Sequence, residues 1–544
     1  MKKFRFLKIA MAVAILAGFS SCNDDVNVDS NNPIDGEAAK SYVSVSINIP
    51  IENGMKGAED SSVDEQGLPA ESDIKNVTFY FFEESTNTPF LAAGTYDYLG
   101  LYRGTLTMSA ADFSVSGTTH SSATPKAVSG LEIGKSYNVY AVVNGTTNIS
   151  LTAGTTTEAT FLETSRVTET TIANVSTTGF PMANRQKALK DDAGNGNIVP
   201  FSRLTISTGN NATNADAVTL FQMERIMGKL IFTGNDIGNG DNVYILKDGA
   251  LANYATVEIK RVKAINMLKD GYLFRHMTRI PAAEANDFFK PATDFNGFEL
   301  LGDATYDANG DVDSDADYII DPRTKSKTNS TPLATGYEGW YSAGAFTGAP
   351  ADGIQSIIYC LENTMHSGSQ LNGYTTALLF EAEVVPENIV MESATPGTND
   401  AAVAYVTGTH PATFYMIGNM AYGSISALVN AGVNLAPTTI DGTATAVVIA
   451  RDLKNNNVTR CDNGLCYYKY WIKHEPHTER MAVMEYGIVR NNVYKMKVAT
   501  ISGIGESIEE IIDPEEENEQ SNVFISVQLE ILPWIVRTQE DIVL

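Results

Sequence analysis

Residues 42–51 read Tyr-Val-Ser-Val-Ser-Ile-Asn-Ile-Pro-Ile, in which apolar residues alternate with mostly polar ones. Successive side chains of a β-strand point to opposite faces, so a period of two indicates a strand with one buried face. The apolar residues that share this face are Val43, Val45, Ile47, Ile49 and Ile51. The stretch therefore predicts a half-buried strand of about ten residues.

Further segments of the same character follow along the chain. They are rich in Val, Ile, Tyr and Phe and are separated by clusters of Gly, Asn, Asp and Pro, which favour turns. These segments are residues 77–82, 101–106, 137–144, 218–220, 229–233, 257–264, 377–385, 413–417, 445–449, 466–473, 486–501 and 523–532. Helical spacing is rare, and residues 421–431 are its best example. The pattern predicts an all-β fold built from packed sheets.

Composition excludes several classes of function. The 544 residues carry 38 Lys and Arg against 65 Asp and Glu, a net charge of −27, which argues against a sizeable nucleic-acid-binding surface. Hydrophobic residues make up 43% of the chain, enough for ordinary cores, and four cysteines are too few for a disulfide scaffold. No nucleophile elbow, phosphate-binding glycine loop or His-supported nucleophile is visible in the sequence, so we predict no enzyme.

The N-terminus has the features of an exported lipoprotein. Basic residues precede an apolar run at positions 9–19, which is shorter than the roughly 20 residues that span a bilayer and is typical of a signal peptide. Cys22 follows directly and resembles a bacterial lipoprotein processing site, where it would carry the lipid, palmitate included. The acidic residues after Cys22 resemble the surface-export signal of Bacteroidota lipoproteins. Plain secretion with an incidental cysteine is the alternative.

Polar segments divide the rest of the chain. Residues 52–72 are rich in Gly, Ser, Asp and Glu and predict an exposed loop. The Gly- and Asn-rich stretch 209–216 is the expected domain boundary, and residues 303–330 form a long polar insertion. Residues 506–520 carry eight carboxylates and are expected to be an acidic linker.

Two cysteines flank a predicted hairpin turn. Asn463-Gly464 is a strong hairpin signal because both central residues of the turn need a positive φ. Such a turn places Cys461 opposite Cys466, with Cα atoms about 4.5 Å apart, at the short end of the disulfide range. Either a disulfide or two reduced thiols fits this arrangement.

An acidic segment offers a weak calcium candidate. Oxygen-bearing side chains alternate at Asp307, Asn309, Asp311 and Asp313, and calcium takes six to eight oxygen ligands. The spacing does not meet the EF-hand pattern, so a solvated acidic loop is the alternative. We predict no other metal or cofactor.

Several segments together resemble the Bacteroidota fimbrillin family, the subunits of donor-strand (type V) pili. The similarity is greatest to the shaft subunit of the short, or minor, fimbrium. The Val-Arg-Asn-Asn-x-Tyr motif at residues 489–494, followed by Gly-x-Gly at residues 503–505, is the most specific part. The other similar segments are residues 38–42, 134–144, 180–182, 466–468 and 533–534.

The resemblance implies two transthyretin-like β-sandwich domains in tandem with an exchangeable C-terminal strand. A trypsin-like protease removes the N-terminal segment of such proteins, and the C-terminal strand of a neighbouring subunit fills the groove left behind. We therefore expect a signal peptide at residues 1–21, a propeptide containing the leaving strand at 22–56, β-sandwich domains at 57–215 and 216–532, and a donor tail at 533–544.

The cleavage site departs from the family pattern. The related shaft subunit is cut after an arginine, but no arginine occurs between Arg5 and Arg103 in this sequence. We therefore expect cleavage between Lys56 and Gly57. If the first strand instead stays in place, it would be an edge strand of a monomer.

Two C-terminal segments could act as the donor strand. Residues 523–532 have apolar residues at Val523, Ile525, Val527, Leu529 and Ile531 and are expected to complete the second domain. Residues 534–544 are expected to be the donated piece, with apolar residues Trp534, Val536, Ile542 and Leu544. Exchange of these two roles is the alternative.

The function expected from the resemblance is that of a structural subunit of surface fimbriae that supports adhesion and biofilm formation. Its partners would be further copies of itself, the anchor and tip subunits, the maturation protease, and host or bacterial surface ligands. The precursor would be held at the outer membrane by its lipid, and the mature subunit would lie in the fimbrium. The alternatives are a tip or accessory adhesin and a surface glycan-binding lipoprotein.

Overall fold

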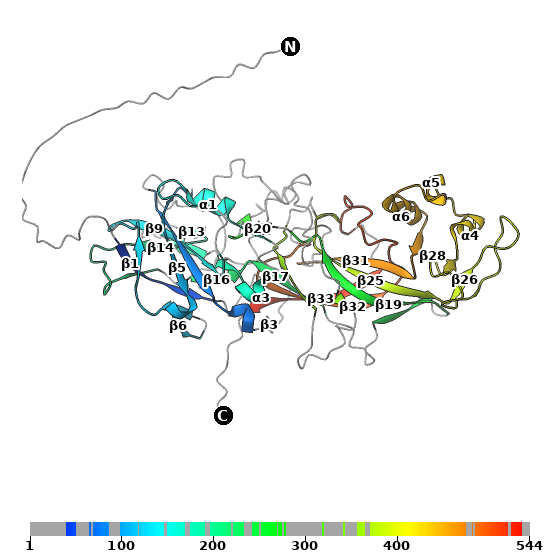
Figure 1. Ribbon diagram of the computed structural model, residues 1–544, viewed down its shortest axis with the longest axis horizontal. Coiled ribbons are helices and arrows are strands. Elements are labelled where there is room, and N and C mark those ends of the chain that lie inside the picture. Colours follow the sequence, from blue (N-terminus) through cyan, green and yellow to red (C-terminus); the bar gives the residue numbers. More distant parts are fainter. Residues whose placement is uncertain are drawn as a thin grey trace, which may run out of the picture. The chain divides into compact units, whose positions relative to one another are not determined.

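Strands dominate the computed structural model (Figure 1), as the alternating pattern predicts, so the chain is all-β. The residues that the structure describes are 40–49, 65–66, 69–85, 98–117, 119–145, 150–168, 174–185, 187–190, 196–218, 221–232, 242–249, 252–268, 270–274, 277–278, 318–319, 341–342, 356–364, 370–474, 481, 485–519 and 524–535. Among these residues no helix is both long and apolar enough to cross a membrane.

The N-terminal sheets contain the first strands of the chain. A nine-stranded sheet has the order β5-β4-β9-β11-β16-β2-β7-β6, with β14 paired to β9, and a three-stranded sheet has the order β15-β1-β8. The strands are β1 (Lys40–Ser44), β2 (Ser46–Asn48), β4 (Asn76–Glu83), β5 (Leu101–Ser109), β6 (Phe113–Ser116), β7 (Thr119–Ser122), β8 (Lys126–Ser129), β9 (Ser136–Val143), β11 (Met182–Asn184), β14 (Ser202–Thr205), β15 (Asp216–Ala217) and β16 (Phe221–Arg225). The helix α1 (Glu158–Thr164) adds Phe161, whose ring packs against Phe82 and Tyr140 at centroid distances of 5.0 and 5.3 Å.

The C-terminal sheets pack against each other around a second core. One has the order β24-β17-β32-β33-β3 and the other the order β18-β19-β25-β31, with β23 paired to β19. Their strands are β3 (Glu65–Gln66), β17 (Met227–Phe232), β18 (Val243–Asp248), β19 (Ala252–Ile265), β23 (Tyr341–Ser342), β24 (Ser356–Leu361), β25 (Ala377–Pro386), β31 (Leu465–Trp471), β32 (Asn492–Ile501) and β33 (Ile525–Ile535). Phe232 of one sheet meets Phe380 of the other at 5.2 Å, and both belong to the same buried core.

Between β25 and β31 the chain forms a smaller five-stranded sheet with three helices. Its order is β27-β26-β29-β28-β30, and its helices have a small core of their own. These elements are β26 (Asn388–Val390), β27 (Val403–Ala404), β28 (Phe414–Ile417), β29 (Met420–Tyr422), α4 (Ile425–Asn430), α5 (Pro437–Ile440), α6 (Ala446–Asn455) and β30 (Val458–Cys461).

The strand predicted at residues 445–449 is wrong, because α6 occupies this stretch. Thr445 caps the helix by accepting a hydrogen bond from the Val448 amide at 3.4 Å, and Ala450 and Leu453 face the protein interior. The remaining short elements described are β10 (Arg166–Thr168), α3 (Val175–Thr178), β12 (Lys187–Lys190), β13 (Gly196–Val199), β20 (Asp270–Tyr272), β21 (Met277–Thr278), β22 (Tyr318–Ile319), η1 (Pro69–Ser72) and η2 (Ala110–Asp112).

The chain passes directly from β16 of the N-terminal sheets to β17 of the C-terminal sheets through a single residue, Ile226, and it also contributes β3 to a C-terminal sheet earlier in the sequence. β16 pairs with β11 and β2, so it belongs to the N-terminal sheets although it follows residue 215. The division into domains at residues 215 and 216, and their transthyretin-like character, stay predictions.

The Val-Arg-Asn-Asn-x-Tyr motif lies beside this crossing. Arg490 is buried and donates hydrogen bonds to Glu362 at 2.7 Å and to the carbonyl of Tyr272 at 2.8 Å. Asn491 donates its backbone N–H to the Met227 carbonyl at 2.8 Å. The hydroxyl of Tyr494 accepts a hydrogen bond from the Val489 amide at 2.8 Å. The motif therefore builds a buried polar network at the start of the C-terminal sheets.

The described residues of two segments expected to be exposed, 65–66 with 69–72 and 506–519, contact the folded body. Within the predicted loop 52–72, η1 places Glu71 in a fully buried position. Within the predicted linker 506–520, Asp513 accepts hydrogen bonds from Arg451 at 3.1 Å and Lys454 at 2.8 Å, and the backbone of Glu517 forms a β-bridge with Leu371. The Asp513 carboxylate is therefore held by two basic side chains, and Glu71 is shielded from solvent.

Candidate functional site

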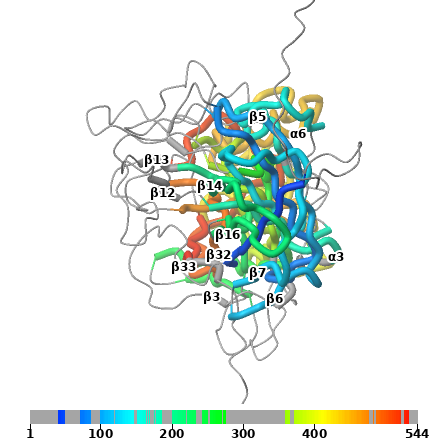
Figure 2. The backbone as a smooth tube through the Cα atoms, turned by 90° about the vertical axis from the view of Figure 1, so that its left-hand side faces the viewer, coloured from blue at the N-terminus to red at the C-terminus, as the bar shows by residue number. Residues whose placement is uncertain are grey.

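The strand formed by β1 and β2, interrupted only at Val45, has hydrogen-bonded neighbours on both sides. On one side it runs antiparallel to β8 and then β7, with Tyr42 opposite Ala127 and Ile47 opposite His120. On the other side it runs parallel to β15 and then β16, where Ile47 lies opposite Phe221. It is the dark blue segment among the N-terminal strands in Figure 2. The alternative of an edge strand is therefore wrong for this structure.

The side chains of this strand alternate as the sequence predicts. Val43, Val45, Ile47 and Ile49 are each at most 1% exposed and belong to the N-terminal core. The residues between them are only partly buried. Ile51, the fifth residue of the predicted face, lies outside the described residues.

Hydrogen bonds continue through the interruption at Val45. Its amide donates to the Ser122 hydroxyl at 3.2 Å, and its carbonyl accepts from the Ser122 amide at 2.8 Å. At the start of the strand, Asn210 bonds both the amide and the carbonyl of Tyr42 at 2.7 Å. The strand is thus fixed along its length by backbone contacts as well as by apolar packing.

Removal of this strand would open the N-terminal core. Each buried Val or Ile side chain contributes about 1.5–3 kcal/mol, so the four contribute roughly 6–12 kcal/mol. That sum is comparable to the whole stability of a domain, about 5–15 kcal/mol. Its loss would also leave unpaired backbone groups on β7, β8, β15 and β16, which are strong templates for another strand. The strand therefore lies early in the sequence but is central in the fold.

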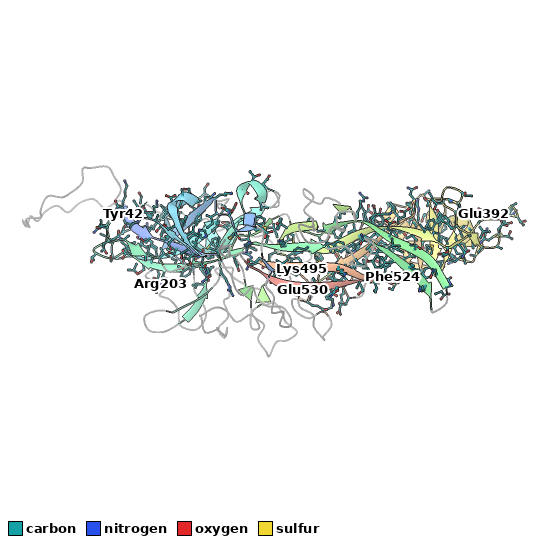
Figure 3. All side chains as sticks on the ribbon, turned by 90° about the horizontal axis from the view of Figure 1, so that it is seen from below. Tyr42, Arg203, Glu392, Lys495, Phe524 and Glu530 are labelled. Atoms are coloured by element: carbon teal, nitrogen blue, oxygen red, sulfur yellow. The ribbon has the colours of Figure 1, made fainter. Side chains whose placement is uncertain are left out.

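The C-terminal strand β33 forms the second part of the site. It pairs antiparallel with β32, and Figure 3 shows Lys495 and Glu530, which lie opposite each other in this register. Val527, Leu529 and Ile531 pack against the C-terminal core, while Gln528 and Glu530 are exposed. In the described part of the chain, β33 pairs with β32 from Ile525 to Pro533, and its last two residues, Trp534 and Ile535, pair with β3 instead.

The predicted hairpin at residues 461–466 is present. Asn463 and Gly464 have φ values of 53° and 78°, and the Leu465 amide donates to the Asp462 carbonyl at 2.9 Å. Cys461 and Cys466 are buried and are not bonded to each other in the structure, and the choice between a disulfide and two reduced thiols stays a prediction. Burial raises the pKa of Cys461 well above its usual value and that of Cys466 to about 11.

Several predicted site residues lie outside the described residues. They are Cys22, Lys56, Gly57, Asp307, Asn309, Asp311, Asp313, Val536, Ile542 and Leu544. Among the residues that are described, no group of three or more His, Cys, Asp or Glu is placed to hold a metal ion.

Two family models match this chain. The family "Major fimbrial subunit protein (FimA)" matches residues 41–245, and "Major fimbrial subunit protein type IV, Fimbrillin, C-terminal" matches residues 460–540. The first match begins in β1 and the second contains β33. Together they cover just over half of the sequence. The chain belongs to the fimbrillin family, and it is a structural fimbrial subunit, not an enzyme.

Three of the solved structures that are similar to the chain are named as fimbrial proteins. A fimbrilin (FimA) from Porphyromonas gingivalis is 15% identical, covers 92% of this chain and 99% of its own, and gives a TM-score of 0.37. A C-terminally truncated tip fimbrial protein from the same organism is 10% identical, with coverages of 91% and 100% and a TM-score of 0.27. A fimbrial assembly protein from Parabacteroides distasonis is 11% identical, with coverages of 64% and 99% and a TM-score of 0.24. These TM-scores are too low to bear on function. No curated relative matches the sequence.

Proposed function

We propose that this fimbrial subunit polymerises by donor-strand exchange as a shaft subunit. In this proposal the precursor is exported as a lipoprotein through Cys22 and is cut by a trypsin-like protease between Lys56 and Gly57. The cut releases the strand β1–β2 from the N-terminal sheets. A C-terminal segment of the next subunit then fills the groove, and the resulting filament, joined to anchor and tip subunits, supports adhesion and biofilm formation.

The observation that supports this proposal is the two-sided burial of β1–β2. A strand with neighbours on both sides and four core residues leaves a groove that a single incoming strand fits. An inserted strand gains main-chain hydrogen bonds along both edges, and alternate side-chain pockets select its sequence. Because the groove is part of a domain core, the joint between subunits would be as stable as that core.

Two segments compete for the groove in this proposal. The tail 534–544 spans roughly 36 Å when extended, but Thr538 and Glu540 fall between its apolar residues on the same face. β33 has the uninterrupted alternation that the groove accepts, yet Val527 and Leu529 already pack in the C-terminal core. We keep the tail as the proposed donor and β33 as the alternative.

Filament assembly by truncated protein tests the proposal. Protein lacking residues 536–544 retains all of β33 as the structure describes it. We expect the truncated precursor to melt like the full chain but to form no filaments after cleavage, as seen by electron microscopy. Normal filaments from the truncated protein would contradict the tail as donor.

Cross-linking identifies the segment that fills the groove. Ser121 of β7 lies opposite Ser46 and therefore borders the groove. Filaments carrying Ser121→Cys with Thr538→Cys, and separate filaments carrying Ser121→Cys with Gln528→Cys, are treated with a short bifunctional thiol reagent. Cross-linked dimers from the first pair support the tail, and dimers from the second pair support β33. Dimers from neither pair would contradict donor-strand exchange into this groove.

A further inference from the structure

Lys75 is a second residue after which a trypsin-like maturation protease could cut. Between Lys56 and Arg103 the sequence contains one Lys or Arg, which is Lys75. Its side chain is about half exposed, at 49%, so the side chain alone would not prevent recognition. A second cut after Lys75 would remove the whole segment before β4.

The segment just before Lys75 is anchored to the C-terminal sheets. The Glu71 carboxylate is 1% exposed and lies 2.9 Å from the Lys229 ammonium group, which is itself 2% exposed. The Tyr359 hydroxyl donates to the same carboxylate at 2.5 Å. Lys229 on β17 and Tyr359 on β24 lie opposite each other in the sheet. The Glu71 carboxylate therefore contacts two adjacent strands at the same level.

Arg225 extends this anchor along the backbone. Its Nε donates to the Glu71 carbonyl at 3.2 Å and its Nη2 donates to the Ser72 hydroxyl at 3.1 Å. Arg225 is fully buried, and this burial lowers its pKa to about 10.

A second anchor holds Lys75 itself to the N-terminal sheets. Asn144, at the end of β9, accepts the Lys75 amide at 2.6 Å and donates to the Asp73 carbonyl at 2.6 Å. Ile74 between them is only 9% exposed. Gly179 lies so close to the Asn144 side chain that a Cβ at position 179 would be 2.4 Å from its Nδ2. Asn144 is thus packed tightly into the position from which it binds the segment.

A protease acts on backbone that can leave the protein surface and extend into its active site, and native segments are cut in proportion to their open population. Opening around Lys75 requires release of Glu71, Ile74 and the Asn144 contacts together. We propose that residues 71–76 form a proteolytic stop, which confines the maturing protease to Lys56 although Lys75 is exposed. This inference rests on the proposed cleavage at Lys56.

Limited proteolysis tests the stop. The precursor is incubated with trypsin, and new N-termini are followed by mass spectrometry. We expect wild type to accumulate the product that begins at Gly57 and Glu71→Gln to yield, at least tenfold faster, a product that begins at Asn76. The matched control is Asp73→Asn, which removes only the exposed ion pair between Asp73 and Lys75 and should cut like wild type.

Further variants keep the result interpretable. Tyr359→Phe removes one hydroxyl from the anchor and should give an intermediate rate of cutting after Lys75, which preserves the test if Glu71→Gln does not fold. Glu71→Gln combined with Lys75→Gln should abolish the Asn76 product. Equal cutting after Lys75 in folded wild type and folded anchor variants would overturn the proposal.

The readout separates this inference from the proposed function. Cleavage is measured on single subunits, so matured protein that stops at Gly57 but never forms filaments would refute donor-strand exchange and support the stop. Filaments whose subunits begin at Asn76 would support exchange and overturn the stop.

Discussion

The substitution Ile47→Ala should affect the stability of the precursor and that of the filament differently. Ile47 is fully buried in the N-terminal core of the precursor, on the strand that we propose is released. The substitution should therefore destabilise the precursor and leave the filament unchanged. A residue that stays in the core throughout should affect both.

The magnitude follows from the burial of this side chain. Truncation of a buried Ile to Ala costs about 2–5 kcal/mol, because apolar contacts are lost and a cavity remains. For a folding unit of 150–250 residues, the size of the proposed N-terminal domain, 1 kcal/mol shifts the Tm by about 2–4 °C, so the Tm of that unit should fall by roughly 4–20 °C. In filaments from which β1–β2 has been removed, the expected shift is zero.

Calorimetry of the precursor and heat dissociation of filaments in detergent are the two assays. Met182→Ala is the matched control, because Met182 is equally buried in the same core but lies on β11, which is not released. Met182→Ala should lower both the Tm of the precursor and the temperature at which filaments dissociate. If Ile47→Ala weakens filaments as much as Met182→Ala does, or if filaments retain residues 40–49, the proposed release of the strand is refuted.

Three further predictions concern the rest of the molecule. Arg490→Met should lower the free energy of unfolding by about 3–5 kcal/mol in chemical denaturation, because it leaves Glu362 buried without its cation. The double variant Arg490→Met with Glu362→Leu should recover part of this loss. Cys461 and Cys466 should react slowly with a thiol reagent near pH 8 in the native chain, since burial raises both pKa values, and rapidly after denaturation. If the denatured protein has two reactive thiols fewer than its sequence provides, the two cysteines form a disulfide. The pKa of Asp112, lowered from 3.8 to about 2 mainly by its hydrogen bond to Lys126, gives a stabilisation that is present above pH 3.8 and lost as the pH falls towards 2; an NMR titration that places the pKa near 4 would contradict this.

Local alternation made the first strand predictable. The buried and partly exposed residues of β1–β2 follow the period of two read from residues 42–51, because strand geometry fixes which side chains share a face. Its two-sided pairing could not be read in this way. The partners of Ile47, His120 and Phe221, lie far along the chain, and no local pattern names them.

Two predictions from the sequence, the strand at residues 445–449 and the exposed loop around Glu71, differ from the structure for physical reasons. The run Val447-Val448-Ile449 has strong β-propensity, but Thr445 caps a helix and tertiary packing of Ala450 and Leu453 decides the outcome. Glu71 lies in a polar, Gly-rich stretch that predicts a loop, and its burial depends on distant partners, among them Lys229 and Tyr359.

The motif at residues 489–494 could be found in the sequence, but the contacts that it makes could not. It was recognisable as a resemblance, yet its physical role depends on Glu362 and on carbonyl groups more than 200 residues away. Sequence spacing does not place those groups beside Arg490. The structure shows that the motif fixes the polar junction where the C-terminal sheets begin, and so its role is architectural.

The one-residue passage between β16 and β17 has a mechanical consequence. Ile226 is 1% exposed and the strands on either side of it belong to different sheets, so the polypeptide has no slack where it leaves one and enters the other. Tension applied along a pilus of such subunits would be carried through this taut covalent crossing. The anchored segment 71–76 is a second short link between the two sets of sheets, so such a load would be shared between two covalent crossings.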